Sequence, residues 1–249
     1  MSEQLARLAD ELASAEKAAV FTGAGVSTAS GIPDFRSEGG IWEDHDPELF
    51  NIRTFERDPS AFWEAMLAVH DAAFPDDVSP NPAHEVIARL ESSGYLDGVI
   101  TQNADRLHQE AGSENVIELH GNLDRIVCQS CKQRGSFDPV KERAEKGEIP
   151  PRCEDCEGLL KPDAVLFGEQ LPEHAVFRAH ALAEKVDLFL VAGSSLTVEP
   201  AASLPEKATR KGATLAIVNF EPTRHDEIAD FVFHEDVTEV FPELVSMIE

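Results

Sequence analysis

The first fifteen residues place apolar side chains at helical spacing. Leu5, Leu8, Leu12 and Ala15 recur every three or four positions with charged residues between them, which predicts an amphipathic helix. The apolar run AAVFTG follows and ends in a glycine turn from Gly23 to Gly25. The pattern therefore predicts a helix that leads into a strand and a tight turn.

Four more apolar runs have the length of buried strands. They are Gly98 to Thr101, Val116 to Leu119, Val186 to Ala192 and Thr214 to Val218. Helix-compatible stretches lie between them, and several runs are followed by Gly, Ser or Asn. Strands that alternate with helices predict a parallel, doubly wound sheet. The expected fold class is therefore α/β and Rossmann-like.

Two segments do not follow this alternation. Residues 38–92 mix aromatic and acidic residues with several prolines, and residues 125–160 contain every cysteine. We interpret them as a helical insertion and a cysteine module that together build a smaller composite domain. The large domain then comprises residues 1–37, 93–124 and 161–249, which suits a chain of 249 residues.

Charge narrows the classes of partner. The chain has 47 acidic and 21 basic residues and a formal net charge of −26, which argues against direct nucleic-acid or membrane binding. The scattered acids indicate a surface suited to high salt, although an ordinary acidic protein or one with lysine-rich partners has the same composition. With no apolar stretch near ~20 residues and no signal-peptide pattern, we expect a cytoplasmic protein, and a monomer.

Four cysteines form two C-x-x-C pairs, Cys128 with Cys131 and Cys153 with Cys156. Two such pairs are typical of a tetrahedral zinc ribbon, in which four protein ligands leave no coordination position for substrate. We predict one structural zinc ion. The alternatives are two disulfides, which a reducing cytosol disfavours, a redox dithiol, which needs only one pair, and an iron–sulfur cluster.

The run TGAGVSTASGIPDFR follows the first predicted strand. Gly23 and Gly25 would let the backbone approach a pyrophosphate, while the next helix offers free N–H groups to it. Alone, this turn is weak evidence, because a plain tight turn explains it as well and Thr28 replaces the third small residue of the fingerprint. Phe35 and Arg36 suit a loop that closes over a charged, partly aromatic ligand; core packing and a surface ion pair are the structural alternatives.

Polar residues also follow other predicted strands, where open α/β sheets bind ligands. Gln102, Asn103 and Asp105 could together hold an amide and a ribose by hydrogen bonds, whereas a helix cap would use only one or two of them. The predicted adenosine or ribose contacts are Ser194, Ser195 and Asn219.

His120 follows the strand-like run VIEL. The chain has nine histidines, and a histidine is more often a surface or satisfied residue than a base. Its place at a strand end favours a functional role, because a near-neutral imidazole can take a proton from a ribose hydroxyl. No serine or cysteine stands in a nucleophile context. We therefore predict that His120 is a general base.

Several motifs occur in a specific order: GAGVSTASGIPDFR, TQNADRLH, HG, the two C-x-x-C pairs, KPDAVLFGE, GSSLTVEP and VNFEP. In this order they resemble the sirtuins, which are NAD-dependent protein-lysine deacylases, over nearly the whole chain, and the first looks most like the prokaryotic members. The resemblance implies that NAD is consumed. The acyl oxygen of a modified lysine attacks C1′ of the nicotinamide ribose, and nicotinamide, free lysine and O-acyl-ADP-ribose are released.

The resemblance also assigns roles to single residues. His120 deprotonates the ribose, Asn103 positions a water and the ribose, and Asp105 with the backbone near Ala104 holds the nicotinamide amide. The residues expected to bind NAD are Gly23, Ala24, Gly25, Thr28, Phe35, Arg36, Gln102, Asn103, Ala104, Asp105, His120, Gly193, Ser194, Ser195, Asn219, Glu221, Asp236 and Val237. The residues expected to form an apolar acyl-lysine tunnel are Val165, Phe167, Gly168 and Val198.

Two departures from the family pattern matter. Ala104 stands where the family usually has isoleucine, which implies looser packing beside the leaving nicotinamide. Met66 and Val69 stand where sirtuins that remove succinyl or malonyl groups have a Tyr-x-x-Arg pair, so no cation is expected for an acidic acyl group. We predict a preference for acetyl or another neutral acyl group on a protein or peptide, which would add as a strand between two loops.

Three other functions are alternatives, because they use the same predicted cleft or fold. An ADP-ribosyltransferase would share the cleft, and a non-catalytic NAD or zinc interaction module would share the fold. Such a module is expected to have lost Asn103, Asp105 or His120, and all three are present. A hydride-transferring dehydrogenase is disfavoured because the dinucleotide fingerprint is incomplete.

Overall fold

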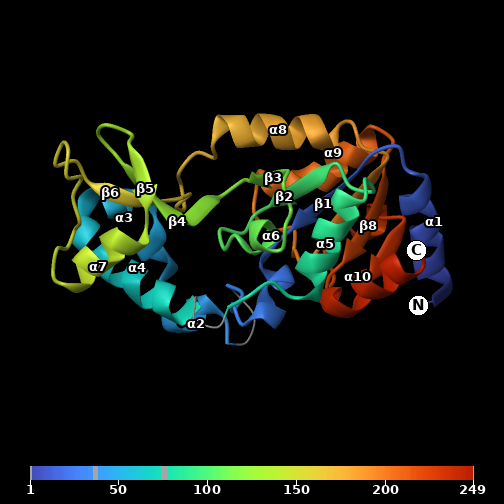
Figure 1. Cartoon of the computed structure of the whole chain (residues 1–249), viewed down its shortest axis with the longest axis horizontal. Helices are drawn as coiled ribbons and strands as arrows, with labels where there is room; N and C mark the ends of the chain where they lie inside the picture. The colour runs from blue at the N-terminus through green and yellow to red at the C-terminus, as the bar shows by residue number, and fades with distance from the viewer. Residues whose placement is uncertain (1, 36–38, 74–77, 249) are drawn as a thin grey trace.

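A computed structural model describes residues 2–35, 39–73 and 78–248 of the chain. A large domain and a smaller domain lie side by side along the longest axis of the molecule (Figure 1). The predicted ligand residue Arg36 lies outside the described residues. Within these ranges, no helix is long and apolar enough to cross a membrane.

The large domain is built on a six-stranded sheet in the order β3-β2-β1-β7-β8-β9. All neighbouring strands are parallel. The chain runs outward from β1 to β3 and later returns beside β1 to continue in the other direction, so the topological switch point lies between β1 and β7. The strands are β1 (Ala18–Thr22), β2 (Gly98–Thr101), β3 (Val116–Glu118), β7 (Leu188–Ala192), β8 (Thr214–Val218) and β9 (Phe231–Phe233).

Helices cover both faces of this sheet because its strands are apolar on both sides. Alternate strand residues such as Val20 and Leu190 pack on one face against α1, α5 and α10, while Phe21 and Phe189 pack on the other against α8 and α9. Figure 1 shows α8 and α9 on the side opposite α10. The helices are α1 (Ser2–Ser14), α5 (Pro82–Ser92), α8 (Glu173–Ala183), α9 (Leu204–Arg210) and α10 (Val237–Ser246).

The small domain combines a three-stranded antiparallel sheet, in the order β5-β4-β6, with four α-helices in the described residues. Its core contains Phe62, Trp63 and Phe137 together with Cys128 and Cys153. The strands are β4 (Gly121–Cys128), β5 (Arg134–Ser136) and β6 (Leu160–Ala164), and the helices are α2 (Ile41–Asp44), α3 (Ile52–Arg57), α4 (Pro59–Ala73) and α7 (Asp138–Glu145). Strand β4 follows β3 directly and connects the two domains (Figure 1).

The domain boundaries expected from the sequence need correction at three places. Helix α5 falls in the predicted insertion 38–92, yet Ala83, Ile87 and Leu90 are buried in the core of the large domain. An amphipathic pattern shows that a helix packs, but not on which core. The predicted boundaries at 124–125 and 160–161 fall inside β4 and β6, which pair with each other.

The local predictions agree with five of the six strands of the large-domain sheet and differ from the structure of that domain at two points. Strands β2 and β8 have the predicted bounds, while β9 was not predicted because three residues give too short an apolar run. The glycine turn leads into two 3-10 turns, Ala24–Val26 and Thr28–Ser30, and not into the α-helix that the fingerprint requires.

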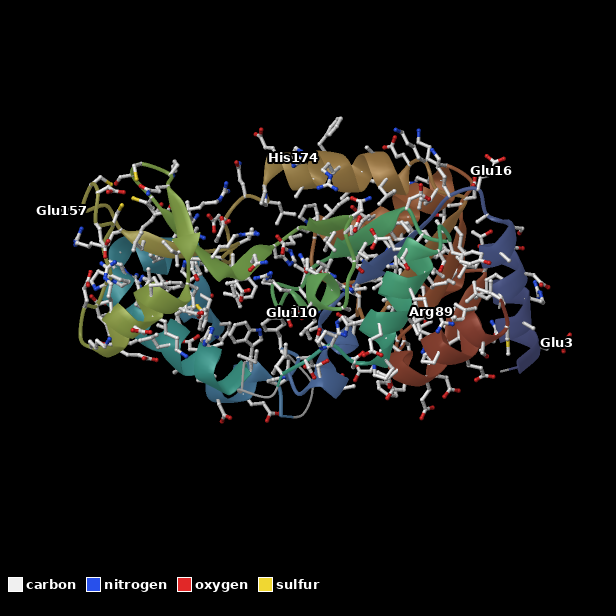
Figure 2. All side chains as sticks on the ribbon, in the orientation of Figure 1. Glu3, Glu16, Arg89, Glu110, Glu157 and His174 are labelled. Carbon is white, nitrogen blue, oxygen red and sulfur yellow. The ribbon has the colours of Figure 1, made fainter. Side chains whose placement is uncertain are left out.

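Acidic side chains lie at both ends of the molecule, as Glu3, Glu16 and Glu157 show (Figure 2).

Candidate functional site

The carboxyl ends of β1, β2 and β7 meet at the switch point. The N–H of Gly23, after β1, donates to Ala192 O at 3.2 Å, and Gly25 N–H donates to Gly193 O at 2.9 Å. Open α/β sheets bind their ligands at this position. The structure therefore brings together the glycine turn, the QNAD segment and the GSS segment, as the sequence predicts.

The glycines allow two loops to approach closely. A Cβ on Gly23 would lie 2.9 Å from Gly193 O, and a Cβ on Gly25 would lie 2.8 Å from the same oxygen. Gly193 has a φ of +61°, and a Cβ there would lie 2.3 Å from the Val26 nitrogen. From the sequence, ligand approach or a plain tight turn explains Gly23 and Gly25; the close contact between the two loops is a further reason for them.

Polar side chains link the loops across this edge. The Gln102 amide donates to Ser194 Oγ at 2.9 Å. The Asn103 amide donates to Gly23 O at 3.2 Å and to Ser27 Oγ at 3.0 Å. These bonds hold Asn103, in the segment after β2, against the turn that follows β1.

Asp105 is held by a chain of hydrogen bonds. Ser27 Oγ donates to Asp105 Oδ2 at 2.7 Å, and Leu107 N–H donates to Asp105 Oδ1 at 3.0 Å. Burial raises the pKa of Asp105, and these bonds lower it in part. An ionised Asp105 could accept a hydrogen bond from an amide N–H, and a protonated Asp105 could also donate one to an amide oxygen.

His84 lies behind Ser27 and was not predicted from the sequence. Its Nδ1 accepts the N–H of Asn81 at 3.4 Å, so the hydrogen is on Nε2, which lies 3.5 Å from Ser27 Oγ. The His108 ring lies 4.8 Å from the His84 ring, and both are buried. Burial lowers the pKa of His84 to about 4 and that of His108 well below its usual range. A neutral, buried pair of histidines therefore lies behind Ser27.

His120 is half-buried in the short turn between β3 and β4. Its Nδ1 lies 2.9 Å from Gln102 O. A carbonyl only accepts hydrogen bonds, so Nδ1 carries the hydrogen and Nε2 keeps its lone pair. Burial lowers the pKa of His120, and the bond to Gln102 partly opposes this. The ring has the tautomer and the charge state of a general base.

The VLFG segment lies directly beside His120. Val165 N–H donates to His120 O at 2.8 Å. Phe167 has 42% of its surface exposed, so core packing does not explain this side chain. Its ring centroid is 5.9 Å from that of Trp42, which stacks at 5.3 Å on Phe35. An aromatic, partly open surface thus lies next to the predicted base, as expected for an apolar acyl site.

The remaining predicted ligand residues have mixed surroundings. Thr28 Oγ1 donates to Gly25 O at 3.1 Å, and the Asn219 amide donates to Glu221 O at 2.7 Å. Asp236 caps α10 by accepting Thr238 N–H at 2.7 Å, and the Val237 side chain is buried in the large-domain core. The structure thus gives the last two a structural role, and their contact with NAD stays a prediction. The others are exposed or half-buried at loop positions, namely Ala24, Ala104, Ser195, Gly168 and Val198.

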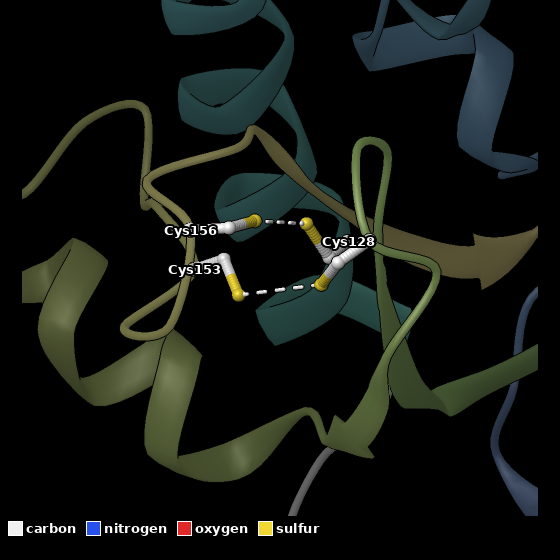
Figure 3. Close-up of side chains that lie close together, drawn as sticks. Cys128, Cys153 and Cys156 are labelled. Atoms are coloured by element: carbon white, nitrogen blue, oxygen red, sulfur yellow. Dashed lines mark hydrogen bonds between the residues drawn. The ribbon is translucent and has the colours of Figure 1, made fainter.

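The four cysteines converge in the small domain (Figure 3). All four Sγ atoms lie within 4.8 Å of one another, with Cys128 to Cys156 at 3.5 Å and Cys131 to Cys153 at 3.8 Å. Tetrahedral Zn–S bonds of about 2.3 Å place the sulfurs about 3.8 Å apart. The residues fit one zinc ion, held apart from the switch-point cleft.

Taken together, the fold and the site define a Rossmann-like nucleotide-binding protein with polar side chains gathered at the switch point, a half-buried histidine beside them and a four-cysteine module. The chain belongs to the Sir2 family, whose profile matches residues 23–200. It is 49% identical over 245 residues to an NAD-dependent protein deacetylase of Haloarcula marismortui, covering 98% of this chain and 94% of that one. It is 47% identical to one of Sulfolobus acidocaldarius, covering 99% and 96%. The resemblance inferred from the motifs is confirmed.

Solved structures show the same fold. A structure described as the basis for the mechanism and regulation of Sir2 enzymes matches with a TM-score of 0.89 and 44% identity, covering 100% of this chain and 98% of that one. A Sir2 complex with a p53 peptide and NAD+ matches with a TM-score of 0.88 and 39% identity, covering 96% of each chain. The predicted α/β, Rossmann-like fold class is confirmed.

Proposed function

We propose that this protein is an NAD-dependent protein-lysine deacetylase, which releases nicotinamide, the free lysine and O-acetyl-ADP-ribose. The observation that carries the proposal is the state of His120. Its Nδ1 is fixed by Gln102 O, and Nε2 is left to act as a base. The relatives named NAD-dependent protein deacetylase, and a Sir2 complex with a deacetylated p53 peptide and 3′-O-acetyl-ADP-ribose, support it.

The cleft residues fit a dinucleotide. When NAD is bound, it supplies an electrophilic ribose carbon and a leaving nicotinamide. Asp105 and the backbone at Ala104 would hold the carboxamide, since both oxygens of Asp105 already lie in an ordered network. Gln102 and Ser194, bonded to each other, present amide and hydroxyl groups for the ribose.

His120 would move one proton. Nε2 takes it from a ribose hydroxyl, and the bond from Nδ1–H to Gln102 O stabilises the resulting imidazolium. Asn103 is held by Gly23 O and Ser27 Oγ, so its side-chain oxygen can order a water or the ribose. Each group is placed by an element of the rigid sheet, which lowers the entropic cost of alignment.

The acyl group would lie on the aromatic side of the cleft, beside Val165 and Phe167. A neutral acylated lysine suits this surface, whereas a charged amine or a carboxylate would need a partner there. Met66 and Val69 are buried in the small-domain core, so neither supplies a cation. We therefore propose acetyl or another neutral acyl group as the substrate and one zinc ion as a purely structural component.

Mass spectrometry tests the proposal. The protein is incubated with NAD and an acetyl-lysine peptide. We expect a peptide that is lighter by one acetyl group and an equal amount of O-acetyl-ADP-ribose, with neither product for His120→Ala. A peptide or protein that gains ADP-ribose without loss of acetyl would identify an ADP-ribosyltransferase in place of a deacetylase.

A further inference from the structure

Residues Leu166 to Glu169 form a β-turn beside the general base. Glu169 N–H donates to Leu166 O at 3.0 Å. Gly168 has a φ of +78° while Phe167 has a negative φ, which is the pattern of a type II turn with glycine in the third position. The turn presents Phe167 at its second position, where the side chain is 42% exposed.

A buried ion pair holds this turn from inside. Lys161, on β6, has a side chain only 4% exposed, and its Nζ lies 3.0 Å from Glu169 Oε2 and 2.6 Å from Ala164 O. The same Glu169 oxygen accepts the N–H of Leu166 at 2.9 Å. One carboxylate thus joins the first residue of the turn to the strand that precedes it. We call Lys161 and Glu169 the turn clamp.

A buried ammonium group is costly unless it is paired, and such a pair often adds little net stability over apolar packing. The pair of Lys146 and Glu142, also on the small domain, is exposed, with side chains that are 75% and 68% exposed. Exposed pairs of this kind contribute little. The turn clamp differs because the Lys161 side chain is buried, so the conformation of the turn depends on the pairing of both charges.

Backbone bonds fix where the turn lies. Val165 N–H donates to His120 O at 2.8 Å, Phe167 N–H donates to Phe50 O at 2.9 Å, and Ile52 N–H donates to Phe167 O at 3.0 Å. The turn therefore joins the general base to the small domain. The turn clamp adds the bond that sets how the turn is folded between these anchors.

We propose that Lys161 and Glu169 are positioning residues for the acyl-lysine substrate, an inference that rests on the proposed deacetylase function. They touch neither reacting atom. By holding Leu166 and Gly168 in one conformation, they order the surface on which the acyl chain and the peptide strand dock before the substrate arrives. Ordering this segment in advance lowers the entropic cost of binding.

Steady-state kinetics test the inference with two variants. Lys161→Met removes the cation, and Glu169→Gln keeps the shape and an acceptor for Leu166 N–H while removing the charge. We expect the KM for an acetyl-lysine peptide to rise about tenfold in each. The KM for NAD and kcat should stay within about twofold, because the switch-point cleft and His120 keep their contacts. Lys146→Met is the matched control and should change none of these.

Direct binding separates positioning from folding. A fluorescent acetyl-lysine peptide is titrated with each protein, and far-ultraviolet circular dichroism checks the fold. If Lys161→Met does not fold, the isosteric Glu169→Gln carries the test. Peptide affinity within twofold of wild type in a folded variant overturns the inference, and so does an equal loss for NAD. If the wild type is active and the variants have the same peptide affinity and KM, only the role of the turn clamp is refuted. If the wild type is inactive, the proposed deacetylase function is refuted together with that role.

Discussion

His120 Nδ1 lies 2.9 Å from the backbone oxygen of Gln102, and this contact determines which ring nitrogen is available for chemistry. The oxygen belongs to the strand-end segment that also carries Asn103 and Asp105. The proposed base and the residues predicted to hold the nicotinamide amide are therefore aligned through one piece of backbone. A shift of that segment would displace both together.

The pH dependence of deacetylation should reflect this environment. Burial lowers the pKa of His120 below its ordinary value of 6.5, and only the neutral ring can accept a proton. We expect the acidic limb of kcat/KM for the acetyl-peptide to have an apparent pKa below 6.5. His120→Asn should lose deacetylation while keeping its circular dichroism spectrum. An acidic limb above 6.5 would contradict the assignment.

Zinc removal should affect the small domain selectively. The chain has two tryptophans, and both Trp42 and Trp63 lie in or against the small-domain core that contains Cys128 and Cys153. Trp63 is fully buried and donates to Leu160 O at 2.9 Å. Loss of the ion should separate the thiolates and loosen this core. We expect a red shift of tryptophan emission on chelation, reversed by added zinc.

Elemental analysis gives the matching control for the zinc prediction. The untreated protein should contain one zinc per chain, and Cys156→Ser should bind less zinc and show the emission of the chelated protein. The far-ultraviolet spectrum should change little, because Cys128 and Cys153 belong to the small-domain core and most of the helices and strands belong to the large domain. An unshifted emission in a protein shown to be metal-free would disprove the structural role.

The large-domain sheet could be predicted because its strands are buried on both faces. A run such as GVIT of β2 is apolar throughout and bounded by polar residues, so both its type and its limits can be predicted from the sequence. The pattern fails for α5, whose Ile87 and Leu90 show only that one helix face packs. The choice between two cores depends on contacts between segments distant in the chain, which a local pattern does not contain.

The residues of the candidate site also fall into two groups, those that a local sequence pattern indicates and those that depend on contacts between distant segments. Residues that follow strands, such as Asn103 and His120, could be predicted because strand ends are where α/β sheets bind ligands. Their supports could not: His84 contacts Ser27 across 57 positions, and Glu169 pairs with Lys161 only because a turn folds back on its strand. The sequence motifs contain only part of these pairs: Ser27 lies in GAGVSTASG but His84 lies in no motif, whereas Lys161 and Glu169 both lie in KPDAVLFGE.

The hydroxyl of Ser27 should matter for the use of NAD. It donates to Asp105 Oδ2 at 2.7 Å and lowers the pKa of a carboxyl that burial raises. A hydrogen bond to a charged group contributes about 1.5–3 kcal/mol, so Ser27→Ala should reduce kcat/KM for NAD by about tenfold or more. Ser30→Ala is the control, since Ser30 accepts from Asn81 and does not contact Asp105. Equal losses in both variants would argue against a specific role.

The acyl preference can be measured by competition. Burying a carboxylate without a cation costs several kcal/mol, and Met66 and Val69 offer none. We expect kcat/KM for a succinyl-lysine peptide to be at least about 100-fold below that for the acetyl-lysine peptide of the same sequence. Propionyl-lysine should lie much closer to acetyl-lysine. Comparable turnover of the succinyl and acetyl peptides would refute the preference.

Acidification should destabilise the protein through His84. The ring is buried and its pKa is lowered from 6.5 to about 4. Between these values the unfolded chain binds a proton at this site and the folded chain does not, so the free energy of unfolding falls as the pH falls. From pH 7 to pH 5 the loss at His84 is about 2 kcal/mol.

Other buried groups act on the same equilibrium. His108 contributes in the same direction because its pKa is also lowered, whereas the raised pKa of Asp105 acts in the opposite direction. Comparison of wild type with His84→Gln by urea denaturation at both pH values isolates His84. The variant should lose about 2 kcal/mol less than wild type, and His174→Gln, at an exposed position of α8 (Figure 2), should lose as much as wild type. Equal losses in wild type and His84→Gln would mean that His84 has the same pKa in the folded and the unfolded protein, which contradicts a neutral buried histidine behind Ser27.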